Sequence, residues 1–236
     1  MATAVQQEAE YSAGYGEATQ HARVVLGRIE AALGGATASD QFPGAIMLEE
    51  SSSTWRFPDT LVVWKPTAGP AANPTGLPLV RELVVYRPNP SAAKEPLEIR
   101  QPSNGSVVPS ISNANQWRTI VNQMTSAPAA EKVVMTDLMR TATIGSQTRA
   151  CLRFGVTLTP SASQWSQYVA GTRAWNQLDW PLNMFGTEAG IRQVWLRAEI
   201  QLSPGRETIA NPTAAMPPLP YFGSATLYFS LKKSGP

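Results

Sequence analysis

The chain has few residues that could form a nucleophilic centre. Its only histidine is His21 and its only cysteine is Cys151. A thiolate–imidazole pair would need both side chains together, and no known nucleophile signature surrounds the cysteine. Cys151 stands in the apolar run 150–154, which predicts a buried and inert thiol. We interpret His21 as a solvated or interface residue and expect no enzyme activity.

The acidic residues are scattered along the chain. Glu49 and Glu50 form the one acidic pair, and Asp179 and Glu188 are the candidates for paired catalytic carboxylates in a tryptophan-rich stretch. One histidine and one cysteine exclude the common zinc sites. No glycine-rich phosphate loop and no Gly-x-Ser-x-Gly elbow are present. The sequence therefore predicts no catalytic residue, no cofactor and no metal site.

Seven tryptophans could serve either packing or binding. Trp165, Trp175 and Trp180 lie in a segment without regular alternation and could form a platform for a sugar or a partner protein. Trp64 and Trp195 lie within predicted strands, and we expect both in the core. For the three loop tryptophans the sequence favours a core or subunit interface over sugar binding, and both alternatives stay open.

Composition places these residues in a β-rich protein. Hydrophobic residues make up 43% and charged residues 15% of the 236, with 20 Pro and 17 Gly. Such a chain can bury a sizeable core and suits short strands joined by long loops. A net charge of +2 without a basic cluster argues against a nucleic-acid partner. No stretch has the length of a membrane span, and no signal peptide is visible.

One long helix is predicted at the start. Residues 2–33 contain no proline and are rich in Ala, Glu, Gln and Arg. Their apolar positions recur every three or four residues, and Gly34-Gly35 is a helix stop. The stripe proposed as a helix assembly interface comprises Val5, Ala9, Ala18, Ala22, Val25 and Ile29. A helix of this length spans roughly 45–50 Å, so part of it is expected to project from the head.

After residue 35 the pattern changes to strands. We expect strands at 59–64, 79–87, 97–100, 132–138, 149–158, 194–202 and 224–232, and short helices at 112–124 and after residue 161. Segments 70–78, 175–190 and 204–220 are expected to be loops. The fold class predicted is α+β, with the long N-terminal helix packed on an antiparallel sheet and small helical insertions. The two parts are a helix at 1–35 and a β-rich head at 36–236.

The helix resembles the periplasmic half of a type IV pilin-like helix. The J-type minor pseudopilins of type II secretion and the W-type minor pilins have a similar run after their membrane span. The matching residues are Gln20, Ala22, Arg23, Leu26, Arg28, Ile29 and Leu33. The segments Leu83–Arg87 and Leu97–Arg100 are similar to the early sheet of that family, and 196–202 and 226–231 to its closing strands. The insertion at 159–190 departs from its pattern.

The resemblance implies a pilin-like fold and a structural role without catalysis. A protein of this family is an assembly subunit of a type II secretion pseudopilus or of a type IV pilus-like filament. It would act in protein transport in the periplasm, anchored in the inner membrane by an apolar segment expected before Met1. Its partners would be other pilin-like subunits, met through the helix and the loops of the head. The later part of the stripe is expected to pack on the chain's own sheet.

Two other functions compete with this one. A secreted carbohydrate-binding β-domain would use the three loop tryptophans as its platform. A virion or filament structural protein would also combine long Pro-rich loops with a projecting helix. Exposed coplanar tryptophan rings would favour the first alternative, and eight strands in two layers would favour the second.

Overall fold

A computed structural model describes residues 2–52, 54–67, 69–203 and 219–233, with only the backbone described for 2–11 and 52. The chain opens with α1 (Ala2–Gly34), a single uninterrupted helix. It ends where expected, and the amide of Gly35 still donates to the carbonyl of Ala31 at 3.2 Å. At 1.5 Å per residue, α1 is about 50 Å long.

A five-stranded antiparallel sheet forms the centre of the head. Its order is β1-β2-β3-β4-β5. The strands are β1 (Ala45–Ser52), β2 (Trp55–Trp64), β3 (Leu83–Arg87), β4 (Leu97–Arg100) and β5 (Glu131–Val134). The last six residues of β2 and all of β3 are buried. Both faces of the sheet are therefore covered at its centre.

A second antiparallel sheet has three long strands in the order β10-β9-β8. They are β8 (Leu152–Thr159), β9 (Ala189–Leu202) and β10 (Leu219–Lys232). Alternate residues of β9 are buried, so one face of this sheet is turned to the core and the other to solvent. A small hairpin of β6 (Thr141–Ile144) and β7 (Gln147–Ala150) precedes β8.

Short helices complete the fold. Asn113 caps α2 (Ala114–Ser126) by accepting from the amide of Gln116, and Ser161 with Gln164 forms a capping box for α3 (Ala162–Val169). Single 3₁₀ turns lie at η1 (Val80–Glu82), η2 (Trp175–Gln177) and η3 (Pro181–Asn183). The last two, with α3, lie in the insertion between β8 and β9.

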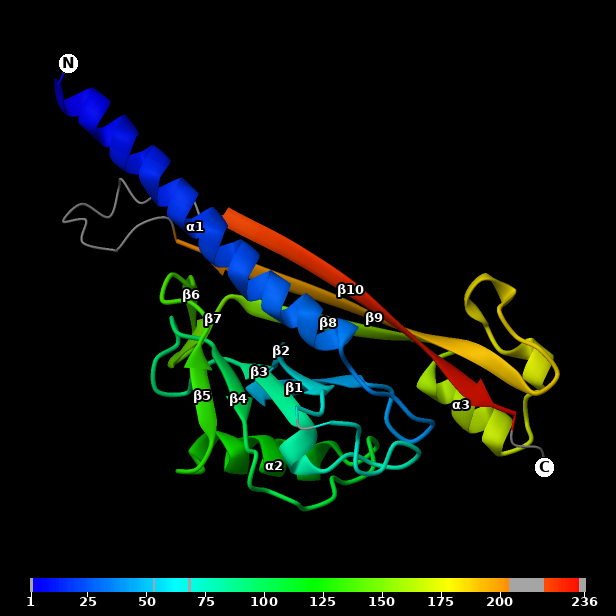
Figure 1. The fold of residues 1–236 in the computed structure, drawn as a ribbon. Helices are drawn as coiled ribbons and strands as arrows, with labels where there is room; N and C mark the ends of the chain where they lie inside the picture. Colours follow the sequence, from blue (N-terminus) through cyan, green and yellow to red (C-terminus); the bar gives the residue numbers. More distant parts are fainter. Residues whose placement is uncertain (1, 53, 68, 204–218, 234–236) are drawn as a thin grey trace.

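The molecule has two main apolar layers. Leu61 and Val63 of β2 share one core with the second half of α1 and the inner face of β8–β10. Val62 and Trp64 point the other way, into a core closed by α2. In Figure 1, α1 lies along β9 and β10, and α2 lies on the far side of the five-stranded sheet.

The predicted fold class is confirmed at the level of an N-terminal helix with antiparallel sheets. The predicted strand 97–100 has the same bounds as β4, whereas β1 and β6 were not predicted. The predicted strand 79–87 begins with a 3₁₀ turn, and 149–158 is divided at Cys151. The predicted loop 204–220 lies almost wholly outside the described residues, and β10 begins at Leu219.

Candidate functional site

The second half of α1 is part of the head's own core. Ala18, Ala22, Val25 and Ile29 are each at most 1% exposed and belong to the cluster that includes Leu196 of β9. These four residues of the predicted stripe are thus closed to any partner helix while the head is folded. Their burial corrects the assignment of the whole stripe as an assembly interface. It fits the expectation that the later part of the stripe packs on the chain's own sheet. The side chains of Val5 and Ala9 lie outside those the structure describes, so their role stays a prediction.

Polar contacts fix α1 on both sheets. Arg28 pairs with the buried carboxylate of Glu98 on β4 at 3.0 Å, and Arg100 shares that carboxylate at 3.3 Å. On the other side Glu30 accepts from the amide of Ser224 on β10 at 3.1 Å. A buried carboxylate with two guanidinium partners is costly to leave unpaired. The helix is therefore held in one position by specific contacts as well as by apolar packing.

The first turns of α1 extend past the ends of the described strands (Figure 1). The first described side chains, residues 12 and 13, are exposed, and burial begins at Gly14. No helix in the described part of the chain combines the length and the apolarity needed to cross a membrane. The helix thus has an embedded part from Gly14 onward and a projecting part before Gly14, called here the embedded half and the projecting half.

The nucleophile candidates are not brought together. His21 Nδ1 lies 2.9 Å from the hydroxyl of Thr136 and 4.0 Å from the carboxylate of Asp137. Cys151 stands between β7 and β8, half-buried, where its amide donates to the carbonyl of Arg140 at 2.8 Å. Burial raises the pKa of its thiol, which disfavours the thiolate.

The carboxylate of Asp179 serves local structure, since it accepts a hydrogen bond from the side chain of Gln164. Glu188 contributes its backbone carbonyl, which accepts from the amide of Lys233 at 2.8 Å. Within the described ranges, no three His, Cys, Asp or Glu side chains are grouped so that they could hold a metal ion.

The three loop tryptophans form a small core. Trp175 and Trp180 are 7% and 5% exposed, and their ring centroids lie 4.5 Å apart. Their indole N–H groups donate to the carbonyls of Gly186 and Trp175, each at 2.9 Å. Trp165 is partly buried against the same cluster, edge-on to Trp175. The rings are tilted or edge-on to one another, and two of the three are buried, which fits the core alternative that the sequence favoured over a sugar platform.

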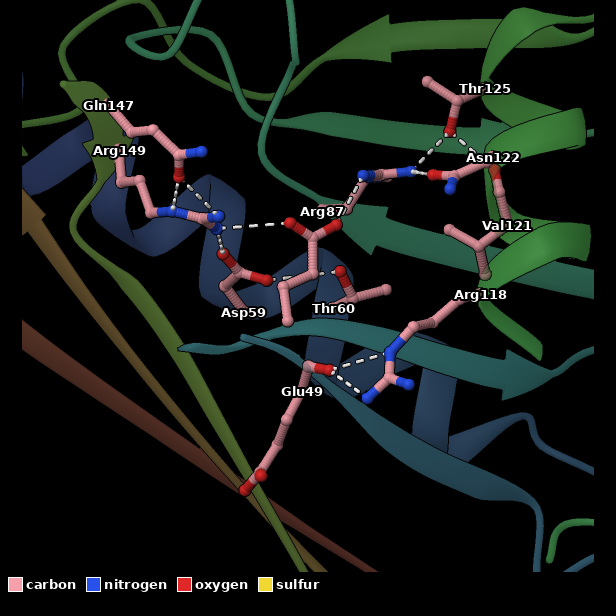
Figure 2. A network of polar contacts seen from close by, with 11 residues as sticks. Glu49, Asp59, Thr60, Arg87, Arg118, Val121, Asn122, Thr125, Gln147 and Arg149 are labelled. Atoms are coloured by element: carbon pink, nitrogen blue, oxygen red, sulfur yellow. Dashed lines mark hydrogen bonds and ion pairs between the residues drawn. The ribbon is translucent and has the colours of Figure 1, made fainter. Parts of the chain in front are cut away.

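An ionic network that sequence reasoning missed joins five elements of the head. Its members are Glu50, Asp59, Arg87 and Arg149. Arg149 Nη1 lies 3.2 Å from Glu50 and 3.3 Å from Asp59, and Arg87 lies 3.0 Å from Glu50. Figure 2 shows Arg87 reaching Asn122 and Thr125 of α2, and Arg149 reaching Asp59 and Gln147. The network ties the hairpin of β6 and β7 and the helix α2 to β1, β2 and β3.

The ionisation of Asp59 is perturbed by this position. Its side chain is 4% exposed, and burial together with the negative charge of Glu50 raises the pKa from 3.8 to about 6. Arg149 and Arg87 oppose the shift, and Thr60 donates a hydrogen bond to the carboxylate at 3.4 Å. Arg149 also stacks 4.0 Å from the ring centroid of Phe57. The network holds several elements of the head together. Its one signal in the sequence is Asp59, a charged residue at the start of the apolar strand 59–64.

Comparison with protein-family models gave no match, and searches of the curated proteins and of the solved structures gave no significant one either. What the structure defines is therefore a class: an α+β protein with a long N-terminal helix whose second half is enclosed by two antiparallel sheets. Its function has to be argued from these features alone.

Proposed function

We propose that this protein is a non-catalytic assembly subunit of a type II secretion pseudopilus or type IV pilus-like filament, of the minor pseudopilin kind. In this role the projecting half of α1 packs against the helices of neighbouring subunits, and the head contributes contacts at the surface. The full-length protein is anchored in the inner membrane with its head in the periplasm.

The observation that carries the proposal is the division of α1 into two halves. A short projecting helix is only marginally stable by itself, because most helical stability in proteins comes from packing, and this favours a helical partner. The embedded half is fixed by Arg28 and Glu30, so the projecting half is presented in a defined direction. A rigid, directed helix is what a subunit needs to join a helical bundle.

The two alternatives have less support. A carbohydrate-binding domain built on Trp165, Trp175 and Trp180 would need exposed rings, and Trp175 and Trp180 are buried. For a virion or filament structural protein, the expected eight strands in two layers are matched in number by the sheets of five and three strands. Their core also includes Val25 and Ile29 of a helix, which a sandwich of two sheets alone would not contain.

A charge placed on the stripe of the projecting half tests the proposal. Val5→Glu and Ala9→Glu are introduced in the full-length protein, expressed with the pilin-like subunits of its host. We expect both variants to lose co-purification with those subunits, because a carboxylate in an apolar helix–helix contact carries a large desolvation cost. Thermal melting of the head should not change.

Gln7→Glu is the matched control. It adds the same charge to the same stretch of helix, at a position predicted to lie off the stripe. Retained co-purification by Gln7→Glu with loss by Val5→Glu and Ala9→Glu would support the proposal. Equal co-purification by all three variants, or a native gene with no apolar segment ahead of α1, would contradict it.

A further inference from the structure

A groove that the proposed function does not use lies over β8–β10 and reaches Met47 and Glu49 of β1 and Pro58 of β2. Its volume is about 450 Å³. The side chains that matter for binding are Arg153 on β8, Trp195, Arg197 and Glu199 on β9, and Phe222 on β10. All five stand on the face of the sheet opposite to α1, because inward and outward residues alternate along these strands. We call this hollow the β8–β10 groove.

The guanidinium group of Arg197 lies in the floor of the groove. Neighbouring residues fix its position, but no carboxylate pairs with it among the described residues. Arg197 stacks with its Cζ atom 4.9 Å from the ring centroid of Trp195. It also passes over Gly155, where a Cβ atom would lie 3.4 Å from its Nε and Nη2 atoms. Among the described residues, neither Arg197 nor Arg153 has a hydrogen bond or an ion pair through its side chain. Both guanidinium groups therefore have donors available for an anion.

The walls of the groove are aromatic. Trp195 is 40% and Phe222 71% exposed, which is unusual for such large apolar side chains on an otherwise polar sheet face. Register places Phe222 opposite Glu199 and Arg197 opposite Ser224, so Phe222 and Arg197 are two residues apart along the strands. Such diagonal neighbours are about 7–8 Å apart, close to the spacing of about 6.6 Å between alternate side chains in an extended peptide.

We propose that the β8–β10 groove binds an acidic, extended peptide segment of a partner protein. A carboxylate of the segment pairs with Arg197, which Trp195 and Gly155 hold in place, and an apolar residue two positions away packs on Phe222 and Trp195. Arg153 adds a second contact to the carboxylate-bearing chain. A guanidinium group forms bidentate hydrogen bonds with a carboxylate, and its stacking on a ring reduces the entropy lost on binding.

Other anionic chains fit less well. Glu49 and Glu199 also line the groove and balance the charges of the two arginines. A nucleic-acid strand carries a phosphate at every nucleotide and would bring several charges past these carboxylates, whereas the proposed peptide needs only one carboxylate, beside Arg197. An acidic polysaccharide would need open aromatic faces, and Arg197 covers one face of Trp195. The groove lies on the head and does not involve α1. Binding there is therefore expected even if assembly through the helix fails.

Calorimetric titration of the whole chain tests the inference. The probe is the peptide Glu-Ser-Leu-Ser-Glu-Ser-Leu-Ser with blocked ends, which places an acidic and an apolar residue two positions apart. We expect it to bind, and Arg197→Gln, Arg153→Gln and Phe222→Ser each to weaken it, Arg197→Gln by about tenfold or more. Arg81→Gln, an exposed arginine away from the groove, is the matched control and should bind as the unmodified chain does.

The same titration also tests the alternative ligands of the groove. The peptide with Lys in place of Glu should not bind. No binding of the acidic peptide, or equal binding by Arg197→Gln, would overturn the inference. Tighter binding of polygalacturonate or of a single-stranded oligodeoxynucleotide than of the acidic peptide would overturn it too, in favour of a polysaccharide or nucleic-acid site.

Discussion

Two arginine–tryptophan pairs lie on opposite faces of β9 and have opposite environments. On the inner face Arg192 lies 5.9 Å from the ring centroid of Trp165, and on the outer face Arg197 lies 4.9 Å from that of Trp195. Arg192 is 3% exposed, and its Nη2 atom has no hydrogen-bond partner among the described residues. Burial lowers its pKa to about 10. Arg197 stands in solvent.

The comparison shows that residue types alone do not define a binding site. The inner pair sits beside the buried cluster of Trp175 and Trp180, which closes the insertion between β8 and β9. The outer pair is exposed and open to a ligand. The difference is set by position in the strand, because neighbouring residues point to opposite faces. Three substitutions of buried residues, each paired with a substitution of a more exposed one, test how much burial changes the effect of a side chain on stability.

The largest effect is expected at the tryptophans. Trp180→Ala removes a side chain that is 5% exposed and stacked on Trp175 and Phe185. We expect it to lower the free energy of unfolding by about 3–5 kcal/mol, measured by urea denaturation. Trp195→Ala, on the outer face, should change it by only about 0.5 kcal/mol. Similar losses for both variants would remove the distinction between the two faces.

A buried charge that has partners gives the next effect, with a pH dependence of known sign. The pKa of Asp59 in the folded protein is about 6, above its ordinary value of 3.8. The folded state therefore binds this proton more tightly, and its contribution to stability is present below pH 3.8 and lost as pH rises through 6. Asp59→Asn mimics the protonated form. We expect it to be more stable than the parent by about 2–3 kcal/mol at pH 7.5, with no difference near pH 3.5.

Glu49→Gln is the control for this pH profile. The side chain of Glu49 is 38% exposed and pairs with the exposed Arg56 at 3.5 Å, so its removal should leave the profile unchanged. Chemical denaturation between pH 3.5 and 8 measures both variants. If the free energy of unfolding changed with pH in the same way for Asp59→Asn and the parent, the ionisation of Asp59 would not be coupled to folding.

The buried charge without an acidic partner gives the smallest effect. Arg192 donates from Nε to the carbonyl of Pro160 at 3.0 Å, and no carboxylate pairs with it in the described ranges. The depressed pKa means that its charged form is disfavoured by folding at every pH below about 10. Arg192→Met should therefore raise the free energy of unfolding by about 1–2 kcal/mol. Arg197→Met should be neutral, and a loss of stability in Arg192→Met would show that its one hydrogen bond outweighs the cost of desolvation.

Local patterns were enough to predict α1 and most of β9. The proline-free run 2–33 and the Gly34-Gly35 stop specify α1, because propensity and capping act within a few residues. Alternation in 194–202 predicts the greater part of β9, which begins earlier, at Ala189. The strand β1 escaped prediction since its second half, Glu49 to Ser52, is polar, and its pairing with β2 is set by the tertiary structure.

The sequence by itself determined that this is an α+β protein with one long amphipathic helix, because helix and strand periodicity are written in neighbouring residues. Only the tertiary structure decided which aromatic residues are buried and which charges meet. Asp59 and Arg149 are 90 residues apart, and Trp195, read as core, lies instead on the outer face of its strand. Burial and ion pairing depend on which segments become neighbours in space, and that is a property of the whole packed chain.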